Sequence, residues 1–189
     1  MQAEGKDFKP IFGVEAYFIP SIEEWREEYE VAMADKKRAR SAKKDAASGA
    51  TVEDETDSKK LQGLLRRRRH LILLAQNQTG LNNLFKLVSE SYQSENFYRY
   101  PRMDYALLAK YGEGVIGASA CLGGVYAGNY WDNGTYDDEG NRTGVDREAA
   151  LDAMRTTTRE MQAIFGDRWY GELQWNNIKE QHELNQLII

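Results

Sequence analysis

The chain has few of the residues that mark specialised classes of protein. Its 189 residues include one cysteine, three prolines and two histidines. A single cysteine excludes an internal disulfide framework and fits a reducing compartment, where the thiol is either a small core residue or a functional ligand. No apolar run approaches the roughly 20 residues that span a bilayer, and the start of the chain lacks the apolar stretch of a signal peptide. We therefore expect a cytoplasmic protein with no membrane partner.

An excess of positive charge is also absent. Lys and Arg number 25 against 30 for Asp and Glu, which gives a net charge of −5. Overall electrostatic attraction to nucleic acid is therefore excluded, and any contact with DNA has to be local. The hydrophobic content of 41% is enough to bury one sizeable core. The composition thus predicts one domain, or most of one, over residues 1–189.

Short apolar runs alternate along the chain with segments of helical periodicity. The runs at residues 10–19, 70–75, 114–120 and 169–174 have the length and composition of buried strands. Helix-type segments separate them. This order predicts the α/β class with a largely parallel sheet.

Capping residues mark where the predicted helices begin. The expected N-caps are Ser21 (with Glu24, in a capping box), Thr79, Asp104, Asp146 and Asn177. Glycines just past the apolar pattern predict that two of these helices end at Gly112 and Gly166.

Two stretches lack both patterns. Residues 35–60 are charged, and nothing apolar recurs at helical spacing before Leu61, so we expect a flexible insertion in a single partial domain. Residues 128–144 form a turn-rich segment whose Asn-Gly and Glu-Gly pairs favour a small hairpin.

Three residues stand out as possible metal ligands: Glu15, His70 and Cys121. They lie on three different predicted strands, whose side chains can converge at one end of a barrel-like sheet. A carboxylate, an imidazole and a thiolate form a mixed set that suits zinc or a similar borderline ion. Simpler interpretations exist, with Cys121 as a small core residue and His70 as a surface residue after four arginines. Glu15 needs a partner in either case, because an unpaired carboxylate in an apolar strand is costly.

Several separated blocks of the sequence resemble one family. In order, they are KPIFGVEAYFIP, RRHLILLAQNQTGLNNLFKLVSESY, YPRMDYALLAKYGEGVIGASACLGG and IFGDRWYGELQ. Together they resemble the PHP (polymerase and histidinol phosphatase) domain of bacterial DNA polymerase III alpha subunits. The resemblance spans nearly the whole chain except the charged stretch and residues 129–144. It implies an incomplete, distorted (β/α)7 barrel of the PHP type, whose complete form binds up to three ions, Zn²⁺ or Mn²⁺, through nine ligands.

The family's ligands transfer to this chain at three positions. Glu15 matches the glutamate of the G-x-E strand, His70 the histidine that opens H-L-x-L-L-A, and Cys121 the residue in S-A-C-L-G-G. The family's H-x-H motif, the aspartate and histidine after it, and its closing D-x-H motif are absent. His182 does not replace them, because it lies on a predicted helix and is expected to face solvent.

The resemblance implies a role in DNA replication. The chain is interpreted as a piece of a longer DNA-directed DNA polymerase, a nucleotidyltransferase, and its apolar end LNQLII is expected to be covered by residues that follow. In that family the domain is a metal-dependent 3′–5′ exonuclease or phosphoesterase, or a platform for the proofreading exonuclease subunit. DNA and replisome proteins are the expected partners. For the 189-residue chain itself we expect weak or no metal binding and no nuclease activity, and no catalytic residue is assigned.

Two other functions remain open at this stage. One is a stand-alone PHP phosphoesterase, and the other is a metal-free scaffold for replication proteins. Two local features also have two interpretations. The arginines at residues 66–69 either contact a phosphate backbone or form a solvated edge. The aromatic segment at residues 97–102 either stacks on single-stranded DNA or packs over the end of the sheet.

Overall fold

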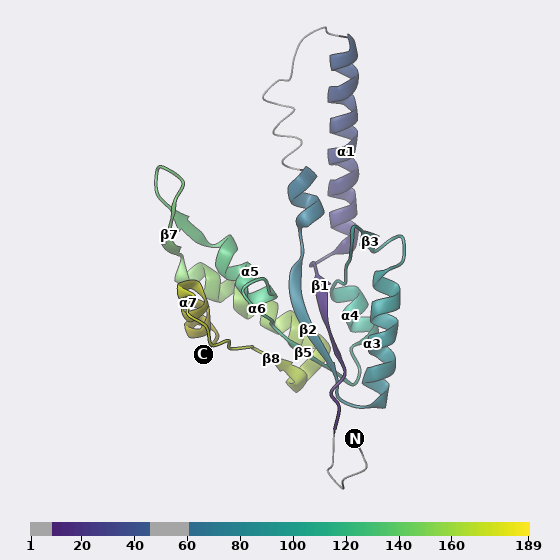
Figure 1. The fold of residues 1–189 in the computed structure, drawn as a ribbon, viewed down its shortest axis with the longest axis vertical. Coiled ribbons are helices and arrows are strands. Elements are labelled where there is room, and N and C mark those ends of the chain that lie inside the picture. Colours follow the sequence, from purple (N-terminus) through teal and green to yellow (C-terminus); the bar gives the residue numbers. More distant parts are fainter. Residues whose placement is uncertain (1–8, 46–60) are drawn as a thin grey trace.

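A computed structural model describes residues 9–45 and 61–189, and it shows a mixed α/β fold (Figure 1). Its strands are β1 (Gly13–Phe18), β2 (Arg69–Ala75), β3 (Phe97–Tyr98), β4 (Tyr100–Pro101), β5 (Val115–Ala118), β6 (Gly134–Tyr136), β7 (Arg142–Val145) and β8 (Trp169–Tyr170). Its helices are α1 (Ile22–Asp45), α3 (Gln78–Ser91), α4 (Tyr105–Tyr111), α5 (Val125–Asp132), α6 (Arg147–Phe165) and α7 (Lys179–Ile188). Residues 61–66 are also helical.

The central sheet has the strand order β1-β2-β5-β8. Strand β2 is antiparallel to both β1 and β5, and the only parallel pair is β5 with β8 among the described strands of this sheet. The prediction of a largely parallel sheet is therefore wrong. The predicted strand at residues 169–174 is also shorter than expected, because β5 ends at Ala118 and leaves a partner only for Trp169 and Tyr170.

The connections explain the strand directions. Between β1 and β2 the chain runs into α1 and returns through the helical residues 61–66, which pack on α1 rather than cross the sheet. The chain therefore re-enters the sheet at the edge that it left, and β2 runs back along β1. Two helices, α3 and α4, separate β2 from β5 and pack on the same face of the sheet, and β5 again runs antiparallel to β2.

Alternation along the strands gives the sheet two different faces. Ala16 and Phe18 of β1 and Leu71 and Leu73 of β2 are buried, and they pack with residues of α3 to α7 in the main core. The intervening residues, which point to the other face, are half-buried or exposed; on β1 and β2 they are Glu15, Tyr17, His70, Ile72 and Leu74. We call this second side the open face.

Helix α1 extends beyond the sheet and packs on residues 61–66 (Figure 1). Trp25 anchors the contact, since its ring is buried and its Nε1 donates to the carbonyl of Leu64 at 2.8 Å. Residues 35–45, part of the stretch expected to be flexible, are helical and continue α1. The sequence DKKRARSAKKD is rich in Ala, Lys and Arg, which favour helix without any apolar face. Residues 46–60 lie outside the described residues.

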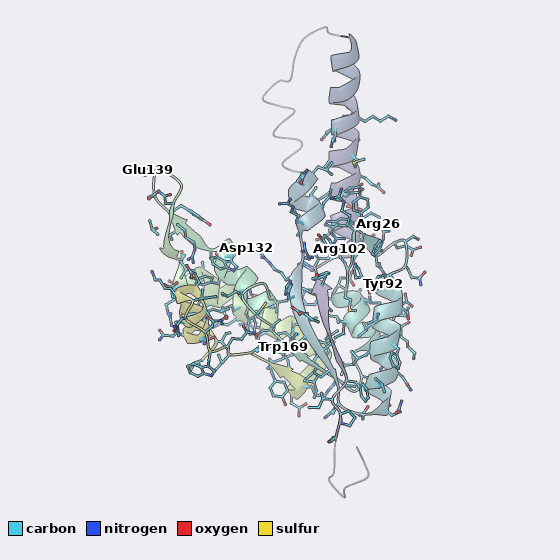
Figure 2. All side chains as sticks on the ribbon, in the orientation of Figure 1. Arg26, Tyr92, Arg102, Asp132, Glu139 and Trp169 are labelled. Carbon is cyan, nitrogen blue, oxygen red and sulfur yellow. The ribbon has the colours of Figure 1, made fainter. Side chains whose placement is uncertain are left out.

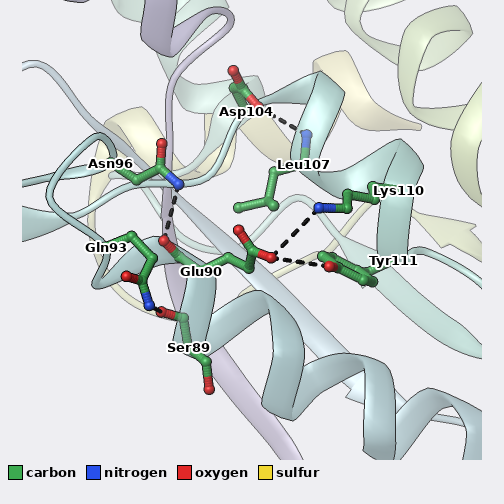
Figure 3. A network of polar contacts seen from close by, with 8 residues as sticks. All are labelled: Ser89, Glu90, Gln93, Asn96, Asp104, Leu107, Lys110 and Tyr111. Atoms are coloured by element: carbon green, nitrogen blue, oxygen red, sulfur yellow. Dashed lines mark hydrogen bonds and ion pairs between the residues drawn. The ribbon is translucent and has the colours of Figure 1, made fainter.

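Helices α3 and α4 are held together by polar contacts. Figure 3 shows Glu90 of α3 accepting a hydrogen bond from the Tyr111 hydroxyl at 3.0 Å and pairing with Lys110 at 3.4 Å. The N-cap of α3 is Asn77, whose side chain accepts from the amide of Gly80, and not Thr79 as predicted. Asp104 caps α4 as predicted, and its second oxygen accepts from the amide of Ile22.

The remaining helices cover the other part of the core. The prediction that residues 128–144 form a loop is wrong at its start, because α5 extends to Asp132, but the predicted hairpin is present as β6 and β7. Helix α5 forms because one side of it is buried in the main core, which outweighs its poor helix formers. Asp146 and Gly166 bound α6 as predicted. Helix α7 begins after Ile178 and has no side-chain cap, so the prediction for Asn177 is wrong.

None of the helices in the described part of the chain is both long enough and apolar enough to cross a membrane.

Candidate metal centre

Glu15, His70 and Cys121 lie together at one edge of the sheet. Strands β1 and β5 run in the same direction and β2 runs opposite, so the start of β2 lies beside the ends of both neighbours. Glu15 is on β1, and His70 is the second residue of β2. The prediction that Cys121 lies on a strand is wrong. Strand β5 ends at Ala118, and the cysteine lies in the turn before α5. The strand directions thus bring together residues that are far apart in the sequence.

The donor atoms of the three side chains converge on one point. One ligand atom from each residue can be chosen so that all lie within 4.8 Å of one another. The Oε1 atom of Glu15 is 2.6 Å from His70 Nδ1, and Cys121 Sγ is 3.6 Å from the same nitrogen. Among the described residues these three form the group of His, Cys, Asp and Glu side chains whose spacing could hold a metal ion.

The same three residue types could instead form a nucleophile, base and acid. Such a triad uses both ring nitrogens, one toward the nucleophile and the other toward the carboxylate. Here Glu15 and Cys121 both approach Nδ1 of His70. The ring therefore cannot relay a proton from the thiol to the carboxylate, whereas an ion placed between the three atoms would contact all of them.

A tight turn holds the cysteine in place. The amide of Gly123 donates to Cys121 Sγ at 3.3 Å, and the carbonyl of Gly123 accepts from the amide of His70 at 2.8 Å. Ala120 has a positive φ of 59°, which is unfavourable for a residue with a Cβ. A Cβ on Gly124 would lie 2.0 Å from the carbonyl oxygen of Ser119, so this position requires glycine.

The site is open on one side. The side chain of Glu15 is 53% exposed and that of His70 is 32% exposed, and Cys121 is half-buried. Sites with three protein ligands keep a coordination position for water or substrate, which is the pattern of catalytic rather than structural zinc sites. The arrangement is thus suited to one ion that remains accessible from the open face.

Sequence reasoning missed two residues beside this group. Tyr17 lies opposite His70 in the β1–β2 register, and the two rings are 5.6 Å apart. The guanidinium of Arg68 lies 4.9 Å from the ring centre of Tyr17. The available signal was the strand period of two, which places Tyr17 on the same face as Glu15 and Arg68 on the same face as His70.

Comparison with known proteins agrees with the geometry of the site. The family model described as the PHP domain matches residues 1–176. The chain belongs to the PHP domain family. PHP domains are metal-dependent, and the Glu15, His70 and Cys121 group is a possible metal site within this one.

Similar proteins are named DNA polymerase III subunit alpha. The protein from Aquifex aeolicus (strain VF5) is 35% identical over 192 residues, which cover 100% of this chain and 12% of that protein. The protein from Borreliella burgdorferi is 37% identical over 134 residues, which cover 69% of this chain and 10% of that protein. The protein from Thermus aquaticus is 34% identical over 137 residues, with coverage of 72% and 10%. The chain therefore spans about a tenth of the length of these relatives.

The other predicted features of this PHP domain chain lie away from the metal group. His182 is on α7 and exposed, as expected. In the arginine run, Arg67 pairs with Glu28 at 2.9 Å and Arg69 pairs with Asp132 at 2.8 Å. These two arginines are therefore held by protein carboxylates.

The two halves of the aromatic segment at residues 97–102 differ in burial. Arg102 is fully buried and Tyr100 is half-buried, so this half packs over the end of the sheet as expected. Phe97 and Tyr98 are 40% and 37% exposed.

A cavity of about 340 Å³ lies between α1, the start of β2 and α5, with Trp25 and Val125 in its wall. None of the three candidate ligands lines it.

Proposed function

We propose that this chain forms part of the metal-binding PHP domain of a replicative DNA polymerase III alpha subunit. The observation that supports it most is the convergence of the Glu15, His70 and Cys121 donor atoms. The match to the family model and the names of the relatives support the placement in a polymerase. The parent would then be a DNA-directed DNA polymerase of the cytoplasm, and DNA would be its partner through other parts of that protein.

In this proposal the sheet is one part of a distorted (β/α)7 barrel. The open face would be the interior of the barrel, and further strands would cover it. Two features support this. Glu15 and His70 lie on the open face rather than in the core, and that face also exposes part of the apolar side chains of Ile72 and Leu74. The helices pack on the opposite face, which would be the outside.

Of the two ions considered, Zn²⁺ fits the three donors better. A thiolate favours Zn²⁺, whereas Mn²⁺ prefers oxygen ligands. Glu15 and His70 approach one another as a hydrogen-bonded pair, and two ligands of one tetrahedral ion lie farther apart, at roughly 3.3 Å. Binding would therefore separate them slightly. The Gly123 amide donates to Sγ and so helps to hold the sulfur in place.

The convergence of the three donor atoms supports a hydrolytic role in preference to a purely structural platform. A bound ion supplies activated water and neutralises phosphate charge in phosphodiester cleavage. Glu15, His70 and Cys121 would hold that ion and leave one side open to the substrate. A platform for the proofreading exonuclease subunit, or a metal-free scaffold, would not require three donor atoms to converge. A 3′–5′ exonuclease or phosphoesterase role of the complete domain is therefore preferred here.

The metal content of the purified chain tests the proposal. The sequence alone led us to expect weak or no metal binding by this chain, but the convergence of the three donor atoms changes that expectation. After dialysis against Zn²⁺ and removal of free ion, elemental analysis of the wild-type chain should find up to one equivalent. Glu15→Gln and Cys121→Ser should each lower the retained amount at least about tenfold, since loss of one of three ligands removes a large part of the binding energy. The control His182→Gln changes the other histidine and should retain the wild-type amount. Equal retention by Cys121→Ser would overturn the proposed site.

Nuclease activity is tested separately. We expect the 189-residue chain to release no nucleotides from a 3′-labelled single strand of DNA, because most of the ligands that the family resemblance implies have no counterpart in it. Metal-dependent release that disappears in Cys121→Ser would show that this expectation is wrong and that three ligands suffice.

A further inference from the structure

Arg68 lies next to the metal site on a platform of two tyrosines. Its Cζ atom is 4.0 Å from the ring centre of Tyr100 and 4.9 Å from that of Tyr17. The two tyrosine rings meet edge to face, with their centres 5.6 Å apart. Since the Tyr17 ring is also 5.6 Å from the His70 ring, this one ring joins the guanidinium to the candidate ligands.

Arg68 differs from its neighbours in having no carboxylate partner among the described residues. Arg67 and Arg69 each form an ion pair, with Glu28 and Asp132. Within the same part of the chain no ion pair of Arg68 is found, and its only hydrogen bond runs from Nη1 to the carbonyl of Arg66 at 3.1 Å. Its Nε is buried and has no hydrogen-bond partner there. Because Nε is buried, a ligand that enters from solvent would contact the terminal nitrogens Nη1 and Nη2 instead.

The packing explains which ligand this guanidinium can take. The tyrosine rings contact the guanidinium through cation–π interactions, which fix its orientation and leave its in-plane N–H groups directed away from the rings. An arginine that presents two parallel N–H groups matches the oxygens of a phosphate group. Glu15, the acidic candidate ligand on this face, already contacts His70 at 2.6 Å.

We propose that Arg68, oriented by Tyr17 and Tyr100, binds a phosphate group of the ligand that occupies the metal site. Arg68 is a positioning residue in this proposal, because it holds the phosphate while the metal group acts on the reacting atoms. The location of the ligand rests on the proposed function. Phosphate binding by Arg68 itself does not rest on the proposed function, because it can be measured without metal.

Binding to the chelator-treated chain tests the proposal. The two probes are inorganic phosphate, followed by ³¹P NMR, and a fluorescent thymidine hexanucleotide without terminal phosphates, followed by anisotropy at low salt. Arg68→Gln should weaken binding of at least one probe about tenfold, the usual effect of losing a charge-assisted contact. If Arg68→Gln loses only the binding of inorganic phosphate, the group that Arg68 binds is a terminal phosphate. If it loses only the binding of the hexanucleotide, the group is a phosphate of the DNA backbone. Both outcomes support the proposal.

Two further variants separate a specific site from general charge. Arg66→Gln removes the same charge from the exposed start of the arginine run, and it should change binding less than about twofold. Tyr100→Leu keeps the charge of Arg68 and removes its platform, so it should also weaken binding, about threefold or more. If Arg68→Gln binds both probes like the wild type, or if Arg66→Gln loses as much affinity, the proposal is overturned.

The remaining measurements keep this inference distinct from the proposed function. Thermal unfolding of Arg68→Gln followed by circular dichroism verifies that the variant is folded, and Arg68→Lys, which keeps the charge, serves as a second variant if it is not. Zinc retention should be unchanged in Arg68→Gln. If the wild type binds phosphate but no zinc, only the metal proposal fails. If it retains zinc and Arg68 is irrelevant to both probes, only the present inference fails.

Discussion

Arg102 shows how a single buried charge organises the chain around the site. Its side chain is fully buried, and Figure 2 shows it between the base of α1 and the strands. Its guanidinium donates to the carbonyls of Leu65 and Tyr98 at 2.9 Å each and stacks 4.2 Å from the ring centre of Trp25. Burial, followed by the positive charge of Arg68, lowers the pKa of Arg102 to about 10, so it remains charged at neutral pH.

Replacing Arg102 tests this role. Arg102→Met should lower the free energy of unfolding by about 3 kcal/mol, because it leaves buried carbonyls without donors. Arg102→Lys keeps the charge but not the planar group, and it should lose a smaller amount. Urea unfolding measures both. The control Arg155→Met removes an exposed arginine that pairs with Asp152, and it should change little. A control loss as large as that of Arg102→Met would contradict this role.

Gly80 marks a close approach of two backbones near the same core. A Cβ at this position would lie 1.8 Å from the carbonyl oxygen of Gly114, in the turn before β5. Gly80→Ala should therefore destabilise the chain by about 3 kcal/mol, since the clash is with backbone and cannot be relieved by a rotamer change.

Gly63 provides the matched control for Gly80. It also lies in a helical segment, and a Cβ there would meet nothing within 4 Å. Gly63→Ala should raise the unfolding free energy by about 0.5 to 1 kcal/mol, because alanine loses less backbone entropy on folding. Thermal unfolding followed by circular dichroism measures both variants. Equal effects of the same sign would contradict the close approach of Gly80 to Gly114.

The candidate ligands and their convergence at one end of the sheet were predicted, but the strand directions that bring them together were not. Glu15, His70 and Cys121 could be selected because they match family motifs. Spacing alone gave no reason to combine them, since they are spread widely along the chain. Arg68 and Tyr17 were missed because their role depends on which residues face each other across β1 and β2, and the sequence does not fix that pairing.

At the scale of helices, the side-chain caps Asp104 and Asp146 were predicted correctly, whereas the cap of α3 is Asn77 and not Thr79. Asp104 and Asp146 both accept a hydrogen bond from the third amide that follows them, which is a local interaction that the sequence encodes directly. Helix α5 was missed because it depends on burial against distant segments. Gly128, a poor helix former, leaves room there for the side chain of Arg69, since a Cβ would lie 2.5 Å from its Nε.

The attachment of α7 to α5 should depend on pH. The Tyr130 hydroxyl donates to Glu183 of α7, and this hydrogen bond is the main reason that the pKa of Glu183 lies below its ordinary value. A carboxyl whose folded pKa is lowered contributes stability above its unfolded pKa, and this contribution is lost as the pH falls through the folded value. The contact should therefore weaken on acidification below about pH 4.5, near the ordinary pKa of a glutamate.

Glu183→Gln tests the pH dependence. The variant should unfold at a lower temperature than the wild type at about pH 7, and the difference should shrink between about pH 4.5 and about pH 3 as the wild-type carboxyl becomes protonated. Glu180→Gln, on the same helix, is the control and should not show this narrowing. A difference that is constant over the whole pH range would contradict the assigned hydrogen bond.

For the whole molecule, the strands of the sheet could be identified from the sequence, but the direction of each strand could not. The runs around β1, β2 and β5 are apolar enough to identify as strands. Their directions depend on where the connections pack, and no local pattern shows that the apolar face of α1 packs on Leu61, Leu64 and Leu65. The result is a sheet with helices on one face and Glu15, Tyr17 and His70 on the other.

This arrangement makes metal binding a property of the whole fold. The three candidate ligands come from β1, β2 and the turn after β5, so all three segments must be in place before they can hold one ion. An ion that binds only the folded chain raises its stability, by about 2.7 kcal/mol at a free concentration of about 100 times the dissociation constant. For a chain of this size that corresponds to a rise of about 5 to 10 °C in the unfolding temperature.

Thermal unfolding with and without Zn²⁺ measures this coupling. The wild type and His182→Gln should both show the rise, and a chelator should reverse it. Cys121→Ser should show at most a small rise, because the remaining carboxylate and imidazole come only from the adjacent strands β1 and β2. Zinc that binds the unfolded chain lowers the rise in unfolding temperature. This reduction affects the wild type and His182→Gln alike, because both keep the cysteine. An equal rise in Cys121→Ser would place the ion elsewhere and separate the turn after β5 from the metal site.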